Sequence, residues 1–393
     1  MVSKEMLQLG SARSVIRELF EYGKQRAAVV GADNIFDFSL GNPSVPAPPV
    51  VNETAIGILQ DQGATIHGYT SAQGDLTARS RFAQSLNRRF GSDYAPEDLY
   101  ITVGAAAALC CCFQALACPG DEFIVFAPYF PEYRVFIAAT GCKMVEIPPE
   151  IEGFQIDFDA FERAIGPHTK GVVVNSPNNP SGVVYSLGTL ERLAGILTAK
   201  SEEYGHPIYL ISDEPYREIV FSGFTVPWLP QIYRDTIVCY SFSKSLSLPG
   251  ERLGYVLVPK QITDSQDVYA AVAGAGRSLG YVNAPSLFQQ VASICCEETA
   301  DLSVYERNAK LFVPALREMG YHVAEPGGAF YLFPRSLEPD DTAFSERAKE
   351  LDLLLVPGRG FGAPGHVRIA YCVQTEMIER SLPRFKALAE AYR

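Results

Sequence analysis

Short apolar runs rich in valine and isoleucine alternate with longer segments of helical pattern through the middle of this 393-residue chain, which limits the possible folds more than any other feature. Continuous apolar runs are typical of parallel strands covered by helices on both faces. Residues 189–204 carry leucine and alanine at helical spacing between two such runs, as a right-handed crossover requires. The runs themselves are 122–128, 143–148, 171–177, 207–214, 236–242 and 252–259. The sequence therefore predicts an α/β fold, with a mostly parallel central sheet flanked by helices.

After residue 285 the pattern changes to long helices around a few short strands. Helical spacing covers residues 286–319, 341–351 and 376–392, and apolar strands are expected in 328–334 and 366–372. Such a mixture predicts a second, smaller α+β unit. We therefore expect an N-terminal arm and part of the small domain in residues 1–40, a large α/β domain in 41–285, and a small C-terminal domain in 286–393.

Composition and charge disfavour several classes of function. The chain has 33 basic and 45 acidic residues, a net charge of -12, without any run of like charge, so nucleic acids and anionic membranes are unsuitable partners. The longest apolar run, 104–117, is too short to cross a bilayer, and the N-terminus lacks the apolar core of a signal peptide. These features predict a cytoplasmic protein.

Cysteine and histidine usage points away from disulfides and metals. The nine cysteines include consecutive ones inside apolar, helix-like runs, where they serve as small reduced hydrophobes. The five histidines are scattered singly, without the spacing of a metal site. We therefore expect structural thiols and no metal.

Polar residues collect directly after the predicted strands. In a parallel sheet, ligands bind beyond the carboxyl ends of the strands, so these residues are candidate site residues. They are Asn175, Asn179 and Ser181 after one run, Asp213 and Tyr216 after the next, and Ser241, Ser243 and Lys244 after a third. A fourth run ends in TVGAAAAL, residues 102–109, where a helix start could bind a phosphate through its backbone N–H groups, although close helix packing explains the alanines equally well.

Lys244 and Asp213 are the most informative of these residues. A charge at the end of an apolar strand needs a partner, so Asp213 is either part of a structural salt bridge or cap, or holds a proton on a ligand nitrogen. Lys244 alone could be a solvated side chain. Among Ser241, Ser243 and Arg252, however, it is typical of a lysine that forms a Schiff base beside a bound phosphate.

With these residues assembled, nearly the whole chain resembles the class I/II, fold-type I family of pyridoxal-phosphate-dependent aminotransferases, in its aspartate-aminotransferase-like form. The motifs that carry the resemblance occur in the family's order. They are SLGNPSVP (39–46), HGYTSAQGDLTAR (67–79), TVGAAAAL (102–109), APYFPEY (127–133), NSPNNPSG (175–182), SDEPYREI (212–219), SFSKSLSLPGERLGY (241–255), PGGAFYLF (326–333) and HVRIAYC (366–372).

The resemblance implies a role for each matching residue. Lys244 would form the Schiff base with pyridoxal 5'-phosphate and then move the substrate proton, and Asp213 would keep the pyridine nitrogen protonated. The other implied cofactor contacts are Asn179 and Tyr216 at the phenolic oxygen, Phe130 stacked on the ring, and Ser241, Ser243, Arg252 and the amides of Ala105 and Ala106 at the phosphate. Tyr69 would reach the phosphate from the other subunit of a homodimer. Arg368 would bind the substrate carboxylate, with Gly41 and Asn179 nearby.

The implied reaction moves the amino group of an L-amino acid, aspartate or a broad range of donors, to a 2-oxo acid by ping-pong kinetics through Lys244. Two departures bear on aspartate. Ala106 stands where one subgroup has a lysine for the distal carboxylate, and Arg277 is one residue out of register with another subgroup's arginine, so a solvent-facing side chain is the simpler interpretation. The alternatives are a carbon–sulfur β-lyase of the cystathionine type and a non-catalytic sensor that binds pyridoxal phosphate.

Overall fold

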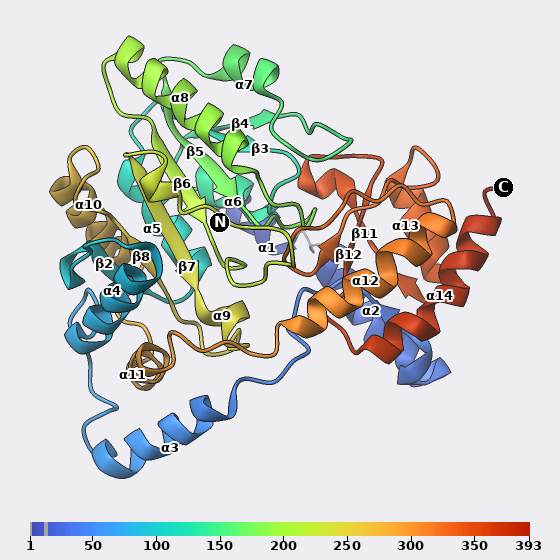
Figure 1. Ribbon diagram of the computed structural model, residues 1–393. Coiled ribbons are helices and arrows are strands. Elements are labelled where there is room, and N and C mark those ends of the chain that lie inside the picture. Colours follow the sequence, from blue (N-terminus) through green and yellow to red (C-terminus); the bar gives the residue numbers. More distant parts are fainter. Residues whose placement is uncertain (1, 12–14) are drawn as a thin grey trace.

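A seven-stranded sheet forms the centre of the computed structural model, which describes residues 2–11 and 15–393 (Figure 1). The strand order is β2-β8-β7-β6-β5-β3-β4, and every strand is parallel to the others except β8, which is antiparallel to both neighbours. The strands are β2 (Leu99–Thr102), β3 (Glu122–Phe126), β4 (Lys143–Ile147), β5 (Thr169–Asn175), β6 (Tyr209–Asp213), β7 (Thr236–Ser241) and β8 (Gly254–Leu257). This arrangement confirms the predicted mostly parallel sheet.

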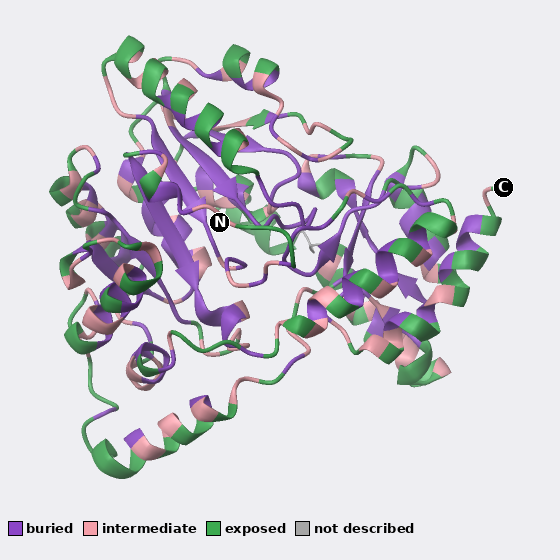
Figure 2. Cartoon of the chain, viewed as in Figure 1, coloured by how far each residue is buried: buried purple, intermediate pink, exposed green. Residues whose placement is uncertain are grey.

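Both faces of the sheet are buried under helices, which explains the continuous apolar runs of the sequence. Val173 packs into the core on one face, while its neighbours Val172 and Val174 pack into the core on the other. Figure 2 shows buried strands and helices whose outer faces are exposed. The covering helices are α4 (Leu76–Phe90), α5 (Ala105–Leu116), α6 (Glu132–Ala138), α7 (Phe158–Ala164), α8 (Leu187–Tyr204), α10 (Ser265–Ser278) and α11 (Ser286–Ile294). Helix α3 (Pro49–Gln62) lies away from the sheet and packs against α11 (Figure 1).

A second core forms around short strands from the end of the chain. β11 (Val356–Pro357), β12 (Val367–Ala370) and β9 (Tyr331–Leu332) make a three-stranded antiparallel sheet in that order. Helices α12 (Ser303–Glu318), α13 (Asp341–Glu350) and α14 (Thr375–Glu390) pack with it. The expected continuous helical segment 286–319 was wrong: α11 ends at Ile294 and α12 begins at Ser303. Between them, the Ala300 N–H donates to the Ser245 carbonyl at 2.8 Å, which ties the linker to α9 (Phe242–Ser245), the short helix that follows β7.

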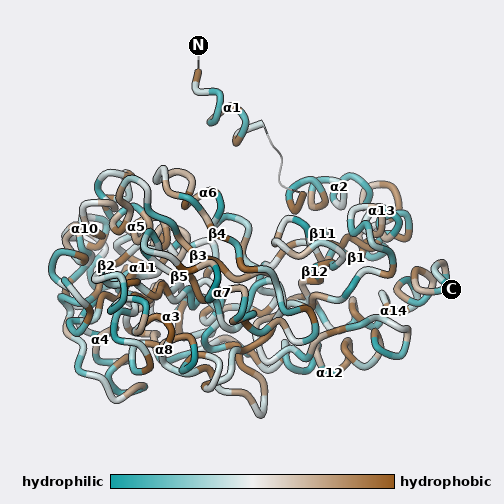
Figure 3. Tube along the Cα trace, turned by 90° about the horizontal axis from the view of Figure 1, so that it is seen from above, coloured by the Kyte–Doolittle hydropathy of each residue, from teal (hydrophilic) through white to brown (hydrophobic). Residues whose placement is uncertain are grey.

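The first forty residues pack with the second core, although they are more than 200 residues away from it in the sequence. β1 (Phe36–Asp37) pairs in parallel with β10 (Leu353–Leu354), and Leu19 of α2 (Val15–Val30) joins the cluster around Leu354 and Val356. Helix α1 (Lys4–Ser11) has no buried residue and lies apart from the rest of the molecule in Figure 3. The division of the chain into domains at residues 40 and 285 stays a prediction.

The remaining elements are short. They are α9 (Phe242–Ser245) and the 3₁₀ helices η1 (Ala32–Asn34), η2 (Pro96–Asp98), η3 (Leu229–Gln231) and η4 (Gly358–Phe361). All nine cysteines are thiols. In the part of the chain that the structure describes, no helix has the length and apolar character needed to cross a membrane.

Candidate active site

The sheet brings the predicted strand-end residues to one edge. Asn175 at the end of β5 lies opposite Asp213 at the end of β6, and Asp213 lies opposite Cys239 on β7. Thr102 of β2 and Ser241 of β7 both face Gly254, the first residue of β8. Because β8 runs antiparallel, its beginning meets the ends of its neighbours, and Arg252 therefore reaches the same edge.

Asp213 is a buried carboxylate with one satisfied and one unsatisfied oxygen. Its Oδ2 accepts a hydrogen bond of 2.5 Å from the Tyr133 hydroxyl, whereas its Oδ1 is buried without a partner among the described residues. Burial raises the pKa of Asp213 to about 7, and the bond from Tyr133 opposes that rise. An unsatisfied buried acceptor is costly, so Oδ1 is positioned to accept a hydrogen bond from a protonated nitrogen of a ligand.

Lys244 projects its amine into the interior from α9, directly after β7. Its Nζ donates to the Gly41 carbonyl at 2.8 Å and lies 5.4 Å above the Phe330 ring. Burial, with smaller contributions from the nearby Arg252 and Arg368, lowers the pKa of Lys244 to about 8. Within the described residues, no carboxylate forms an ion pair with this amine. A larger share of the amine is therefore neutral than in an ordinary lysine.

The residues around the start of α5 form a cradle that suits an anion. Gly104, with φ +90°, precedes the twelve-residue helix, whose first N–H groups have no side-chain cap, and the Ala105 and Ala106 amides lie in its first turn. A Cβ on Gly104 would be strained at this φ and would meet Arg252 Nη2 at 2.8 Å, so glycine favours this approach. The Ser241 and Ser243 hydroxyls are hydrogen-bonded to each other at 2.7 Å. Arg252 has the left-handed φ of +53°, a strain typical of functional sites.

Arg368 is a buried guanidinium whose bonding is incomplete. Its Nη2 donates to the Ser39 carbonyl at 2.6 Å and its Nη1 donates to Asn179 Oδ1 at 3.3 Å, whereas its Nε is buried without a partner in the part of the chain that the structure describes. The guanidinium carbon lies 5.0 Å from the centres of both the Tyr331 and Phe361 rings. Among the described residues, Arg368 has no carboxylate partner. It is therefore positioned to bind a carboxylate of a ligand.

Tyr216 and the loop around Gly41 complete the centre of the site. The Tyr216 hydroxyl is hydrogen-bonded to the Tyr331 hydroxyl at 2.9 Å. A Cβ on Gly41 would lie 2.0 Å from the Tyr331 hydroxyl, so a side chain at residue 41 would displace this pair. Asn175 links two neighbours, because its amide oxygen accepts from the Asn179 N–H at 2.7 Å and its amide nitrogen donates to the Asp213 carbonyl at 2.9 Å.

The other predicted residues lie at the margins. Phe130 is half-buried, and its ring packs at 5.7 Å against that of Tyr133. The Tyr69 side chain is 96% exposed. Together with Arg252, it lines a hollow of about 470 Å³. Arg277 is exposed near the end of α10. Ser181 instead shapes the loop after β5, since its hydroxyl donates to Asn178 Oδ1 at 2.7 Å.

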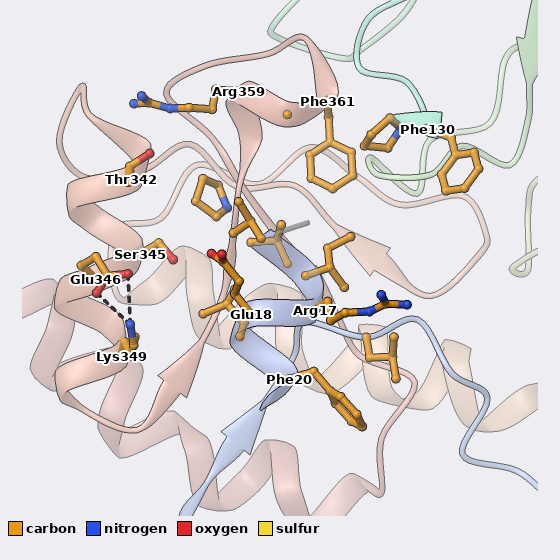
Figure 4. Close-up of a pocket in the computed structure, with 18 of the residues that line it drawn as sticks. Arg17, Glu18, Phe20, Phe130, Thr342, Ser345, Glu346, Lys349, Arg359 and Phe361 are labelled. Atoms are coloured by element: carbon orange, nitrogen blue, oxygen red, sulfur yellow. Dashed lines mark hydrogen bonds and ion pairs between the residues drawn. The ribbon is translucent and has the colours of Figure 1, made fainter. Parts of the chain in front are cut away.

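Residues that the sequence analysis did not single out also belong to the site. Tyr133 holds Asp213, Tyr331 holds Tyr216, and the Ser39 carbonyl holds Arg368. Tyr133 lies in the motif at 127–133 and Tyr331 in the motif at 326–333, yet nothing in their spacing identifies their partners. A cavity of about 800 Å³ opens beside these residues, with Leu40, Phe130 and Phe361 in its lining (Figure 4).

Comparisons with known proteins converge on one family. The sequence model of the family described as aminotransferase class I and II matches residues 33–385. The aspartate/prephenate aminotransferase of Thermus thermophilus is 33% identical over 351 residues, 88% of each chain. The aspartate aminotransferase of Thermotoga maritima is 31% identical over 369 residues, 92% of this chain and 93% of that one. A solved structure of an aminotransferase from Eubacterium rectale is 54% identical, with a TM-score of 0.98, and the match covers 100% of this chain and 99% of that one.

Proposed function

The chain belongs to the class I and II aminotransferase family, and from that premise we propose that it moves the amino group of an L-amino acid to a 2-oxo acid in two half-reactions at the site around Lys244. The family match confirms the predicted aminotransferase and its dependence on pyridoxal 5'-phosphate. The assignment of each residue below is part of the proposal.

The residues present fit this cofactor. The buried Asp213 Oδ1 lacks a partner, which suits a protonated pyridine nitrogen. The start of α5, where Gly104 lies next to Arg252, suits the phosphate. The residues proposed to hold the cofactor are Asp213, Asn179, Tyr216, Phe130, Ser241, Ser243, Arg252, Lys244, the amides of Ala105 and Ala106, and Tyr69. When bound, pyridoxal phosphate supplies an electron-withdrawing ring that stabilises negative charge at the α carbon of an amino acid.

Two basic side chains would then bind the substrate and accept its proton. Arg368, whose Nε lacks a partner, would bind the α-carboxylate as a fork beside Gly41 and Asn179 and so fix the orientation of the α carbon. Lys244 would accept the proton from that α carbon, since its lowered pKa leaves more of the amine neutral. Tyr331 would hold Tyr216 in place through the bond between the two hydroxyls.

The incomplete bonding of the buried Asp213 and Arg368 carries this proposal. Among residues 2–11 and 15–393, one acidic and one basic group each keep an atom without a partner. Both act on the pKa of the buried Tyr216, which Asp213 raises and Arg368 lowers. A purely structural role would pair such groups internally. A ligand that carries both a proton on a ring nitrogen and a carboxylate would satisfy both atoms.

Replacement of Lys244 tests the proposal. The protein reconstituted with pyridoxal phosphate should turn yellow and convert an amino acid and a 2-oxo acid into the exchanged products, measured by chromatography. Lys244→Ala should lower turnover at least about 10⁴-fold, because it removes both nucleophile and base. Lys143→Ala, a change at an exposed lysine paired with Glu122, serves as the matched control and should retain full activity.

The products separate the alternatives. Ammonia and pyruvate formed from a sulfur-containing amino acid, without amino transfer, would identify a carbon–sulfur β-lyase. Cofactor binding without turnover of any donor would identify a sensor. Substantial amino transfer by Lys244→Ala in the absence of added amines would refute the role of Lys244.

The proposal extends to assembly and location. We place the enzyme in a homodimer in which Tyr69 of each chain serves the site of the other, a role that its 96% exposure in the single chain supports. We also place it in the cytoplasm, where nine unpaired thiols would persist.

A further inference from the structure

A large cavity adjoins the site between two parts of the chain distant in sequence. It has a volume of about 800 Å³ and lies between α2, the loop at residues 130–132, α13 and η4. Figure 4 shows Phe130 and Phe361 at one side of it, with Arg17, Glu18 and Phe20 projecting from α2. A volume of this size is in the range that accommodates a small organic ligand.

The cavity begins at the groups proposed to bind an amino acid. Phe361 lines it and lies 5.0 Å from the Arg368 guanidinium carbon. Leu40 also lines it, and the carbonyls on either side of Leu40 accept hydrogen bonds from Arg368 and Lys244. An α-carboxylate on Arg368 would therefore have the wall of this cavity as its neighbour.

The wall near the site is apolar. The Leu40 side chain is 41% exposed, and it faces the cavity together with aromatic side chains. The principal apolar residues are Ile16, Leu19, Phe20, Leu40, Phe130 and Phe361. When an apolar group of a ligand covers such exposed apolar surface in a concave site, the removal of both surfaces from water favours binding.

The charges of the lining do not favour an acidic side chain. Three basic residues, Arg17, Lys349 and Arg359, are matched by three acidic ones, Glu18, Glu132 and Glu346. Lys349 Nζ is paired with Glu346 at 2.9 Å, and Arg359 Nε is paired with Asp341 at 2.6 Å. Lys349 and Arg359 therefore already have carboxylate partners.

We propose that this cavity binds the side chain of the amino donor and that the preferred donors carry bulky apolar side chains rather than a second carboxylate. The inference rests on the proposed function, because Arg368 must bind the α-carboxylate. Ile16, Phe20 and Leu40 are then specificity-determining residues.

Binding of unreactive acids tests the site without any turnover. 3-Phenylpropionate carries a carboxylate and a bulky apolar group, whereas succinate carries two carboxylates. Titration calorimetry with the reconstituted protein should show at least about tenfold tighter binding of 3-phenylpropionate, since burying several methylene equivalents provides discrimination of this size. Equal binding, or tighter binding of succinate, would overturn the inference.

A donor panel with two matched variants tests the wall itself. We expect kcat/KM for phenylalanine and leucine to exceed that for aspartate and glutamate at least about tenfold. Ile16→Ala should lower kcat/KM for phenylalanine and leucine by about 5- to 20-fold and leave that for alanine nearly unchanged. Val29→Ala, the same kind of truncation on α2 at a side chain 77% exposed and outside the cavity, should change none of these values.

The two measurements separate two kinds of failure. If 3-phenylpropionate binds tightly but no donor yields an oxo acid, the proposed reaction fails and the apolar site stands. If amino transfer occurs with aspartate or glutamate as the better donors, the reaction stands and the apolar site is refuted.

Discussion

At the scale of single residues, the site is built from buried groups that the protein itself leaves unsatisfied. The elevated pKa of Asp213 and the lowered pKa of Lys244 both arise from burial. Burial without a full set of partners costs stability in the cofactor-free protein. This cost is the expected signature of a site whose ligand completes the bonding.

Asp213→Asn should therefore stabilise the cofactor-free protein at alkaline pH. The folded pKa, about 7, is raised above the usual 3.8, so the contribution of the bound proton is fully present below pH 3.8 and is lost as the pH rises through 7. At pH 8 the variant should gain about 2–4 kcal/mol in free energy of unfolding over wild type, and the difference should shrink toward pH 4. Denaturant unfolding at pH 5 and pH 8 measures it.

The control is a carboxylate on the surface. Asp159→Asn on α7 changes an exposed residue and should shift the free energy of unfolding by less than about 0.5 kcal/mol at both pH values. The same Asp213→Asn protein should bind pyridoxal phosphate more weakly. A loss of stability at pH 8 in the cofactor-free Asp213→Asn protein would contradict the assigned cause of the pKa shift.

Sequence reasoning identified the residues whose chemistry is local and missed those whose importance lies in a distant contact. Lys244 could be predicted because Ser241, Ser243 and Arg252 surround it within one short segment. Tyr133 meets Asp213 across 80 residues, and Tyr331 meets Tyr216 across 115. Neither pairing leaves a periodic pattern, because the first depends on how α6 packs in the large α/β unit and the second on how the two cores pack together.

At the scale of elements, the positions of strand ends explain why the site forms where it does. The antiparallel β8 returns Arg252 to the edge where β2 and β7 end, which a fully parallel sheet would not do. Periodicity predicted the strands but not this reversal. The helix break at residues 295–302 was missed for a similar reason, because it depends on the bond to the Ser245 carbonyl.

A buried ion pair supports the loop after β6, which follows Asp213 and carries Tyr216. Glu214 and Arg217 form a two-pronged contact, with Arg217 Nη2 2.7 Å from Glu214 Oε1. The Ser212 hydroxyl donates to the same oxygen at 2.6 Å. The guanidinium also lies 4.8 Å from the centre of the Trp228 ring, which packs it into the interior. The contacts of Glu214 and Arg217 therefore hold this loop in place on both sides of Tyr216.

Arg217→Met should lower the free energy of unfolding by about 3–5 kcal/mol, because it leaves the carboxylate of Glu214 buried without its cation. Denaturant unfolding monitors the change. Arg88→Met, which breaks the exposed pair with Glu297, is the matched control and should cost less than about 1 kcal/mol. The double variant Glu214→Gln/Arg217→Met should recover part of the loss. Equal effects of Arg217→Met and Arg88→Met would refute the supporting role.

At the scale of the whole molecule, the single chain leaves features that a second copy would complete. Helix α1 exposes Met6, Leu7 and Leu9 by 44–59% and buries none of its residues. Tyr69 is 96% exposed beside the hollow that includes Arg252. Exposed apolar side chains on a separate helix are typical of a surface that packs against a partner. These features support the proposed homodimer.

Mixed dimers can decide whether Tyr69 serves its own chain or the other. Lys244→Ala and Tyr69→Ala should each be nearly inactive as pure dimers. If Tyr69 acts across the interface, a mixed dimer contains one intact site, made of Lys244 from one chain and Tyr69 from the other. Random mixing makes half of the dimers hybrid, so the refolded mixture should regain about one quarter of wild-type activity, as two-fold symmetry requires.

The competing arrangement gives a different result from the same mixture. If Tyr69 contacts Arg252 within its own chain, each site of the hybrid lacks either Lys244 or Tyr69, and mixing restores nothing. Gel filtration of the separate variants provides the control, because both must form dimers for the comparison to hold. A monomeric wild-type protein with full activity would refute the shared site, since each chain would then have to supply its own Tyr69.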